Sequence, residues 1–142
     1  MTALLDDHLL RDWMARRDDA LVEAVAGEPV ATTNLWYTRL CKSAARVTGG
    51  ALLADWSDAD RRALIAGLVA LPEEIAVTPM RDLAWRMGEL IADHRGLSTL
   101  GAEAVGAAIA MKGRILVSAR DHGPGIRSCC SAVGVSYETL AR

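Results

Sequence analysis

Short apolar runs alternate with longer segments in which apolar residues recur at helical spacing. The runs have the length of buried strands and cover Thr2–Leu5, Pro29–Thr32, Glu74–Thr78, Arg114–Ser118 and Val135–Tyr137. Because strands that alternate with helices form parallel crossover units, the pattern predicts an α/β fold. We expect a three-layer sandwich with a mostly parallel five-stranded sheet.

The segments between these runs carry helix signals. Residues that commonly cap helices precede most of them, and the clearest predicted helices are Leu35–Val47, Ala59–Leu71, Met80–Arg95 and Leu100–Met111. A further helix follows Asp6-Asp7, a short one follows Asp18-Asp19, and another ends at Gly134. Leu52–Trp56 has no clear pattern. In the helix after Pro79, the spacing predicts that Leu83, Ala84, Met87, Leu90 and Ile91 face inward.

Composition narrows the class of protein. The chain has 142 residues, of which 51% are hydrophobic and 24% charged, as expected for one folded domain spanning residues 1–142. The net charge of −2 provides no general attraction to nucleic acid or membranes. No apolar run approaches the ~20 residues of a membrane span. The three cysteines form no CxxC spacing, which argues against a zinc site or disulfides and, with no signal peptide, favours a cytoplasmic protein.

Two aspartates stand where a parallel sheet would place a functional site. Asp6 follows the first predicted strand and Asp121 follows the fourth, and the carboxyl ends of parallel strands share one edge of the sheet. Mg²⁺ and Mn²⁺ prefer oxygen ligands, so converging carboxylates would suit them. An aspartate at a strand end is also a common helix cap, and the spacing alone favours that second interpretation.

The order of several segments resembles the PIN domain family. The matching stretches are ALLDDHLLRDWM, VATTNLWYTRLCKSAAR, GLSTLGAEAVGAAIAMKGRILVSARD and AVGVSYETL. PIN domains are small metal-dependent ribonucleases, and many are toxins of bacterial toxin–antitoxin pairs. The resemblance implies a five-stranded parallel sheet with an acidic site at the carboxyl ends of the strands. It also implies a homodimer and an antitoxin-like protein partner.

The first half of the family's acidic site is incomplete in this chain. The first-strand aspartate of the family matches Asp6, which is followed by Asp7-His8 where the family usually has Thr-Asn or Thr-Ser. The second acid belongs to the helix after the second strand, and its position falls near Arg39. The segment Thr32–Ala54 contains no acidic residue, so no other alignment supplies this acid.

The second half of the site departs from the family as well. Gly101 stands where the third acid is expected, and Glu103 follows two residues later. The fourth acid belongs to a Thr-x-Asp pattern, whereas this chain has Ser118-Ala119-Arg120 there. Asp121 follows at once and is the candidate substitute. A pair of metal ions needs several converging carboxylates, so these changes predict a degraded metal site.

Two functional hypotheses follow from the resemblance. The favoured one is a non-catalytic binding or regulatory module without a cofactor, in which Arg39 and Arg120 are ion-pair partners of Asp6 and Asp121. The alternative is a divergent Mg²⁺- or Mn²⁺-dependent ribonuclease. Its catalytic and metal-binding residues would be Asp6 and Asp121, with Asp7 or Glu103 as further candidates. RNA is an expected partner only under this alternative.

Other residues have a functional and a structural interpretation. Arg39, Lys42 and Arg46 form one helical stripe that would suit a phosphate backbone, although the net negative charge favours a solvated helix face. Trp36-Tyr37, near the expected site, would suit base stacking, although core or interface packing is favoured for all four tryptophans. His8 and His122 are expected at the site edge, where they would suit a phosphate or a metal, although a polar surface histidine is favoured for each.

Overall fold

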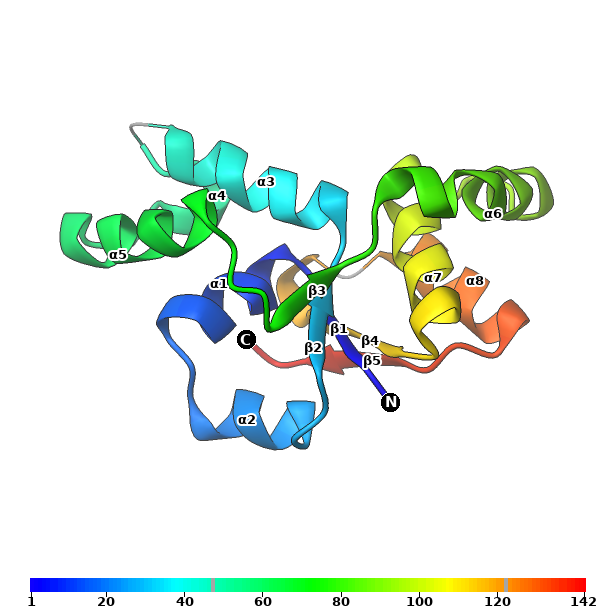
Figure 1. Cartoon of the computed structure of the whole chain (residues 1–142), viewed down its shortest axis with the longest axis horizontal. Helices are drawn as coiled ribbons and strands as arrows, with labels where there is room; N and C mark the ends of the chain where they lie inside the picture. The colour runs from blue at the N-terminus through cyan, green and yellow to red at the C-terminus, as the bar shows by residue number, and fades with distance from the viewer. Residues whose placement is uncertain (47, 122) are drawn as a thin grey trace.

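The computed structural model describes residues 1–46, 48–121 and 123–142 and shows a sheet between two layers of helices (Figure 1). The strands are β1 (Ala3–Leu5), β2 (Val30–Thr32), β3 (Ile75–Val77), β4 (Arg114–Ser118) and β5 (Tyr137–Leu140). Their order in the sheet is β3-β2-β1-β4-β5, and every pairing is parallel. The predicted α/β fold with a five-stranded sheet is therefore confirmed.

The helices connect successive parallel strands. They are α1 (Asp7–Ala15), α2 (Asp19–Val25), α3 (Asn34–Ala45), α4 (Gly50–Leu53), α5 (Asp58–Val69), α6 (Met80–Asp93), α7 (Thr99–Met111) and α8 (Pro124–Val133), with a 3-10 turn η1 (Ala119–Asp121) after β4. A parallel pair of strands needs such a crossover, because the chain must return to the same end of the sheet. Within the described residues, no helix is long and apolar enough to cross a membrane.

Side chains at the predicted capping positions start many of these helices. Asp6, Asp18, Thr33, Ser57 and Ser98 each accept a hydrogen bond from the backbone N–H three residues ahead. Each bond satisfies one of the N–H groups that a helix N-terminus leaves without an intrahelical partner. These local bonds explain why the sequence marks the helix starts well.

The two faces of the sheet carry separate hydrophobic clusters. Leu4, Ile115 and Val117 pack with α6, α7 and α8 on one face. Leu5 and Leu116 pack with α1, α2, α3 and α5 on the other. The residues of α7 that face the sheet are mostly small and are fully buried, which lets this helix approach the strands closely.

Several predicted boundaries differ from the structure by one to three residues. The last strand begins at Tyr137 instead of Val135, because the Val135 N–H donates to the Cys130 carbonyl at 3.0 Å and so completes the end of α8. The helix predicted to reach Val47 ends at Ala45, and Val47 itself lies outside the described residues.

The predicted inward face of α6 is narrower than expected. Leu83, Met87 and Leu90 are buried, but Ala84 is exposed and 41% of the Ile91 surface is accessible. Trp85 is 83% exposed, so packing within this chain does not account for it. Apolar spacing fixes the direction of a helix face but not its width.

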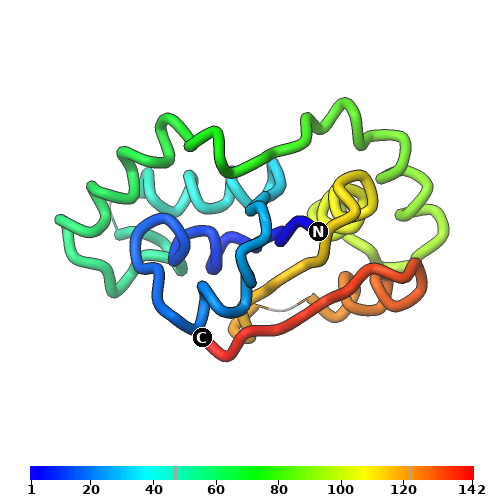
Figure 2. The backbone as a smooth tube through the Cα atoms, turned by 60° about the horizontal axis from the view of Figure 1, so that its bottom comes forward, coloured from blue at the N-terminus to red at the C-terminus, as the bar shows by residue number. Residues whose placement is uncertain are grey.

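The end of the last strand contacts the first helices. Figure 2 shows β5 running beside β4, with the chain end close to the segment that follows β1. Arg142 Nε lies 3.0 Å from Asp12 Oδ2, and Arg142 Nη1 lies 2.8 Å from Asp18 Oδ1. These ion pairs join the edge strand to α1 and to the N-terminus of α2.

Candidate functional site

Asp6 joins β1, α1 and β4 at the carboxyl edge of the sheet. Its Oδ1 accepts a hydrogen bond from Leu9 N at 2.9 Å, and its Oδ2 accepts one from Ser118 N at 2.9 Å. The residue is only 2% exposed. Burial raises the pKa of Asp6 to about 7, although the two backbone hydrogen bonds oppose this shift. Asp6 therefore caps a helix, as one of the two sequence interpretations proposed.

Asp7 is buried beside Asp6 and uses its two oxygens differently. Its Oδ1 accepts a hydrogen bond from His8 N at 3.0 Å and lies 3.1 Å from His8 Nδ1. The hydrogen bond with Asp7 raises the pKa of His8, while burial opposes that shift. Asp7 Oδ2 has no hydrogen-bond partner within the described residues. It lies 3.1 Å from Arg39 Nε, in an ion pair that lacks hydrogen-bond geometry.

Arg39 lies between two carboxylates at this edge. Its Nε faces Asp7 Oδ2, and its Nη2 donates a hydrogen bond to Asp121 Oδ2 at 2.8 Å. Partial burial alone would lower the pKa of Arg39, but the hydrogen bond to Asp121 and the charges of Asp7 and Asp121 raise it. Arg39 thus pairs with Asp121 and Asp7, and not with Asp6, whose oxygens already accept backbone N–H groups.

Arg120 does not take the role that the sequence suggested. Its side chain is exposed and makes no ion pair within the part of the chain that the structure describes. Asp121, its expected partner, pairs with Arg39 instead. The Arg120 backbone N–H donates to Ser118 Oγ at 3.2 Å, and Ser118 Oγ donates to the Arg142 carbonyl at 2.7 Å. Ser118 therefore connects β4 to the segment after β5.

Glu103 holds the N-terminus of α3. Its carboxylate is fully buried and accepts hydrogen bonds from Asn34 N, Asn34 Nδ2 and Leu35 N at 2.9, 2.7 and 2.8 Å. An anion is favourable there because the helix dipole and the free N–H groups both attract it. These bonds account for the buried charge without any metal.

Gly101 stands where the resemblance predicts a third acid, and the space around it is closed. A Cβ atom there would lie 2.9 Å from Leu97 Cδ1 and 3.0 Å from Ile126 Cγ1. An aspartate at this position would have to displace both apolar side chains.

The described residues contain one acidic group with the spacing of a metal site. Ligand atoms of Asp6, Asp7 and His8 lie within 4.8 Å of one another. Glu103 and Asp121 do not join this group. Asp7 Oδ2, the buried oxygen with no hydrogen bond, lies 3.1 Å from Arg39 Nε. These residues fit a divalent cation poorly, because that oxygen already faces a positive charge.

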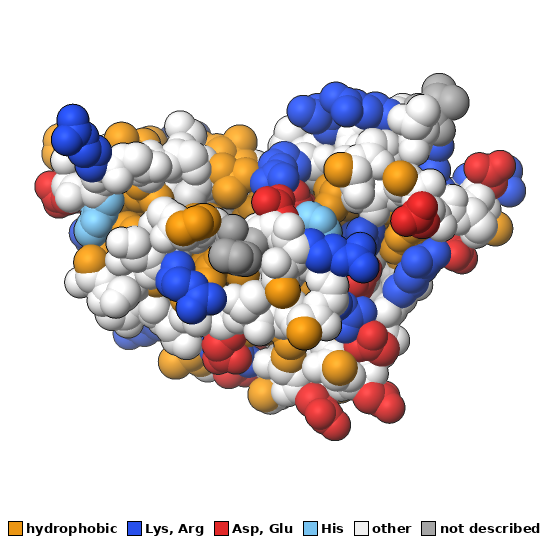
Figure 3. Space-filling model, turned by 180° about the vertical axis from the view of Figure 1, so that it is seen from behind, with side chains coloured by type: hydrophobic (Ala, Val, Ile, Leu, Met, Phe, Trp, Pro, Cys, Tyr) orange, Lys and Arg blue, Asp and Glu red, His pale blue; other side chains and the backbone are white. Residues whose placement is uncertain are grey.

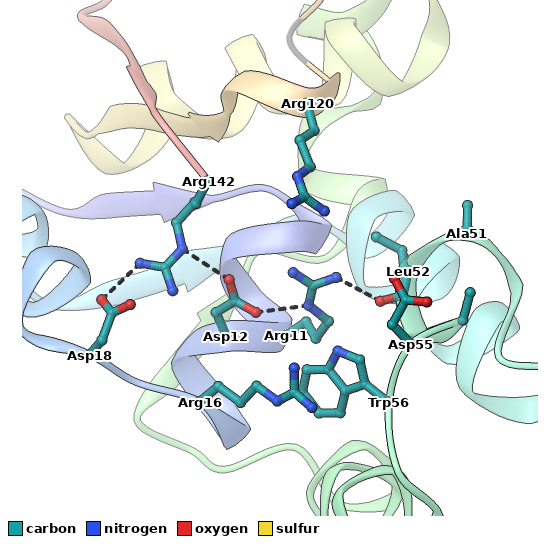
Figure 4. A pocket seen from close by; sticks show the side chains of 11 residues that line it. Arg11, Asp12, Arg16, Asp18, Ala51, Leu52, Asp55, Trp56, Arg120 and Arg142 are labelled. Atoms are coloured by element: carbon teal, nitrogen blue, oxygen red, sulfur yellow. Dashed lines mark hydrogen bonds and ion pairs between the residues drawn. The ribbon is translucent and has the colours of Figure 1, made fainter.

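Two of the pockets next to this edge have volumes above 400 Å³. The first, called the basic pocket, has a volume of about 440 Å³ and is lined by Arg39, Lys42, Ser43, Arg46, Leu52 and Arg120, with His8, Ala51 and Asp121. The second, called the Arg11 pocket, has a volume of about 420 Å³ and includes Arg11, Asp12, Trp56, Arg120 and Arg142 (Figure 4). On the face shown in Figure 3, Lys and Arg side chains gather around a histidine.

Apart from Arg120, the sequence analysis did not single out the residues of the Arg11 pocket as site residues. Arg11 Nε donates to Asp12 Oδ1 at 2.8 Å, and the Arg16 guanidinium lies 3.9 Å from the centroid of the Trp56 ring (Figure 4). Trp56 comes from the segment Leu52–Trp56, where the sequence has no clear pattern. No sequence signal joins residues from α1, from the segment after α4 and from the chain end.

Comparison with solved structures supports the fold. No family model and no curated protein matches this sequence. Among solved structures, the 2.2 Å structure of VapBC-1 from nontypeable Haemophilus influenzae matches with a TM-score of 0.59 over 98% of each chain. The chain shares that fold. With 14% sequence identity, the match supports the predicted PIN-like architecture and leaves the chemistry to the residues of this chain.

Proposed function

We propose that this chain is a non-catalytic binding module that keeps a PIN-like fold without a working metal site. The observation that carries the proposal is the position of Arg39, whose guanidinium joins Asp7 to Asp121. A guanidinium satisfies two carboxylates through directed N–H groups. It therefore takes the place of a bound cation and neutralises the acids that would have held one.

The surrounding residues support the same proposal. Both Asp6 oxygens accept backbone hydrogen bonds, and the Glu103 carboxylate accepts three N–H groups at the start of α3. Leu97 and Ile126 close the space around Gly101. Each carboxylate thus has a structural role, and the proposed module needs no cofactor.

The alternative is a divergent Mg²⁺- or Mn²⁺-dependent ribonuclease. It is favoured by one observation, which is the grouping of Asp6, Asp7 and His8 with a buried Asp7 oxygen that lacks a hydrogen bond. In that case Arg39 would have to move away before the metal bound. RNA would then be the substrate.

Protein partners follow from the same line of reasoning. The resemblance to PIN toxins and the match to VapBC-1 support an antitoxin-like protein partner. The resemblance also supports a homodimer in the cytoplasm. Light scattering coupled to size-exclusion chromatography measures the oligomeric state directly, and a monomer at all concentrations would remove the homodimer from the proposal.

Calorimetry with Mn²⁺ tests the proposal against its alternative. The wild-type protein and Asp6→Asn are titrated with Mn²⁺ under the same conditions, and we expect no binding heat in either protein. Binding tighter than roughly 100 μM in the wild type that disappears in Asp6→Asn would overturn the proposal and support the ribonuclease.

A further inference from the structure

The basic pocket brings positive side chains together from two separate elements. Lys42 and Arg46 come from α3 and its C-cap, and Arg120 comes from η1. Asp121, which also lines the pocket, is already paired with Arg39. Lys42, Arg46 and Arg120 make no ion pair within residues 1–46, 48–121 and 123–142. The pocket therefore has an excess of positive charge that this part of the chain does not neutralise.

In the neighbouring Arg11 pocket, the arginines Arg11 and Arg142 pair with carboxylates. The two pockets share Leu52 and Arg120. In the Arg11 pocket, Arg11 pairs with Asp12, and Arg142 pairs with both Asp12 and Asp18 (Figure 4). Aspartates of the same chain supply these carboxylates. Arg120 extends into this pocket without such a partner.

The lining suits a peptide better than a single-stranded nucleic acid. Proteins that bind single strands stack the bases on accessible aromatic rings. Trp36 is only 2% exposed, and the Trp56 ring already carries the Arg16 guanidinium at 3.9 Å. Ala51 and Leu52 also line the pocket, and the exposed Ala51 would contact an apolar side chain. A segment that combines carboxylates with an apolar residue matches both features.

We infer that the basic pocket is the docking site for an acidic segment of a partner protein, whose carboxylates pair with Lys42, Arg46 and Arg120. This inference rests on the proposed function, because Arg39 must hold Asp7 and Asp121 for the pocket to stay positive. A metal bound to these acids would instead attract phosphate groups. The segment would bind by charge pairing, so its affinity falls as the salt concentration rises.

Fluorescence anisotropy with a short labelled peptide of Glu, Asp and Leu tests this inference. All titrations contain EDTA, so that a metal cannot contribute and the result is independent of the Mn²⁺ experiment. We expect saturable binding that weakens at least about tenfold in the triple variant Lys42→Ala, Arg46→Ala and Arg120→Ala. The same peptide with Gln and Asn in place of Glu and Asp should not bind.

A matched variant separates the pocket from net charge. Arg62, Arg81 and Arg95 are exposed and line neither the basic pocket nor the Arg11 pocket, so their replacement by alanine removes the same charge. Circular dichroism confirms that both triple variants fold. Equal weakening in the two variants, or no saturable peptide binding, overturns the inference. A single-stranded RNA that binds more tightly than the peptide and depends on Lys42, Arg46 and Arg120 overturns it in favour of nucleic acid.

Discussion

Glu103 Oε2 lies 2.7 Å from Asn34 Nδ2, although the two residues are 69 positions apart in the chain. The contact joins α7 to the start of α3. Asn34 Nδ2 also donates to the Thr78 carbonyl at 2.8 Å. One buried polar cluster therefore holds α3, α7 and the end of β3 together beside the candidate site.

Replacement of Glu103 by Gln should destabilise the protein. The Gln amide group would present N–H donors to the N–H groups of Asn34 and Leu35, which then lose part of their hydrogen bonding. We expect a loss of about 2 kcal/mol or more in the free energy of unfolding, measured by urea denaturation. Glu89→Gln is the control, because Glu89 is exposed. Its one ion pair is weak, since Glu89 Oε1 lies 3.9 Å from Arg86 Nη1. Equal stability of the two variants would contradict the role of Glu103.

Replacement of Arg39 by Glu should create affinity for Mn²⁺. The change removes the guanidinium from Asp7 and Asp121 and adds a carboxylate to the same edge, which suits a hard cation. We expect Mn²⁺ to raise the melting temperature of Arg39→Glu and to leave the wild type unchanged. Arg39→Gln is the control, since it removes the positive charge without adding a ligand of equal strength. If Mn²⁺ does not raise the melting temperature of Arg39→Glu, the guanidinium is not what prevents metal binding.

Stability should fall as the pH rises from about 4 to about 7 because of Asp6. The folded-state pKa of Asp6 is about 7, above the ordinary value of 3.8, so the folded protein holds this proton more tightly than the unfolded chain does. Folding is favoured most below the ordinary pKa, and the advantage is lost as pH rises through the folded pKa. Each unit of pKa difference is worth about 1.4 kcal/mol, which predicts a loss of several kcal/mol.

The pH profile needs a control because neighbouring groups also titrate. The charge of Asp7 raises the pKa of Asp6 and that of His8 lowers it, and the raised pKa of His8 itself favours folding at lower pH. Urea denaturation of the wild type and Asp6→Asn across this range separates the contributions. A stability profile with the same slope in both proteins would rule out Asp6 as its cause.

Replacement of Arg114 by Met should destabilise the protein at the amino end of β4, on the side of the sheet away from the candidate site. Arg114 is 8% exposed, and its guanidinium pairs with Glu28 at 2.9 Å and Glu138 at 3.0 Å. Its Nη2 also donates to the Ala24 carbonyl. The loss leaves Glu28 without its partner, and we expect about 2 kcal/mol of destabilisation in urea denaturation. Arg62→Met, at an exposed position, should change stability by less than about 0.5 kcal/mol.

The adjacent cysteines should resist alkylation in the folded protein. Cys129 and Cys130 are 1% and 0% exposed, and burial raises the pKa of Cys130 to about 12. The thiolate is the reactive form, so neither residue should react with iodoacetamide near neutral pH. Mass spectrometry should find label on half-buried Cys41 before the pair, and on all three after denaturation. Early labelling of Cys130 would contradict its packing in the core.

The sequence alone was sufficient for the order of the strands and of the longer helices, and for their boundaries to within one to three residues. Apolar runs, capping residues and the glycine after α8 are local signals, and Asp6, Asp18 and Ser98 act on N–H groups only three residues away. The position of Asp6 at the carboxyl edge of β1 follows from the same local pattern. That is why the fold and one part of the candidate site could be predicted.

The partners of the charged groups depended on tertiary structure. Arg39 and Asp121 are 82 positions apart, and no local pattern says that α3 brings this guanidinium to Asp7 as well. The packing of α7 against α3 decided that Glu103 would hold a helix start. Arg39 pairs with Asp121, and Arg120 makes no ion pair among the described residues. The sequence determined the position of each charged residue along its helix or strand. Only the relative placement of the helices and strands decided which charged side chains form ion pairs.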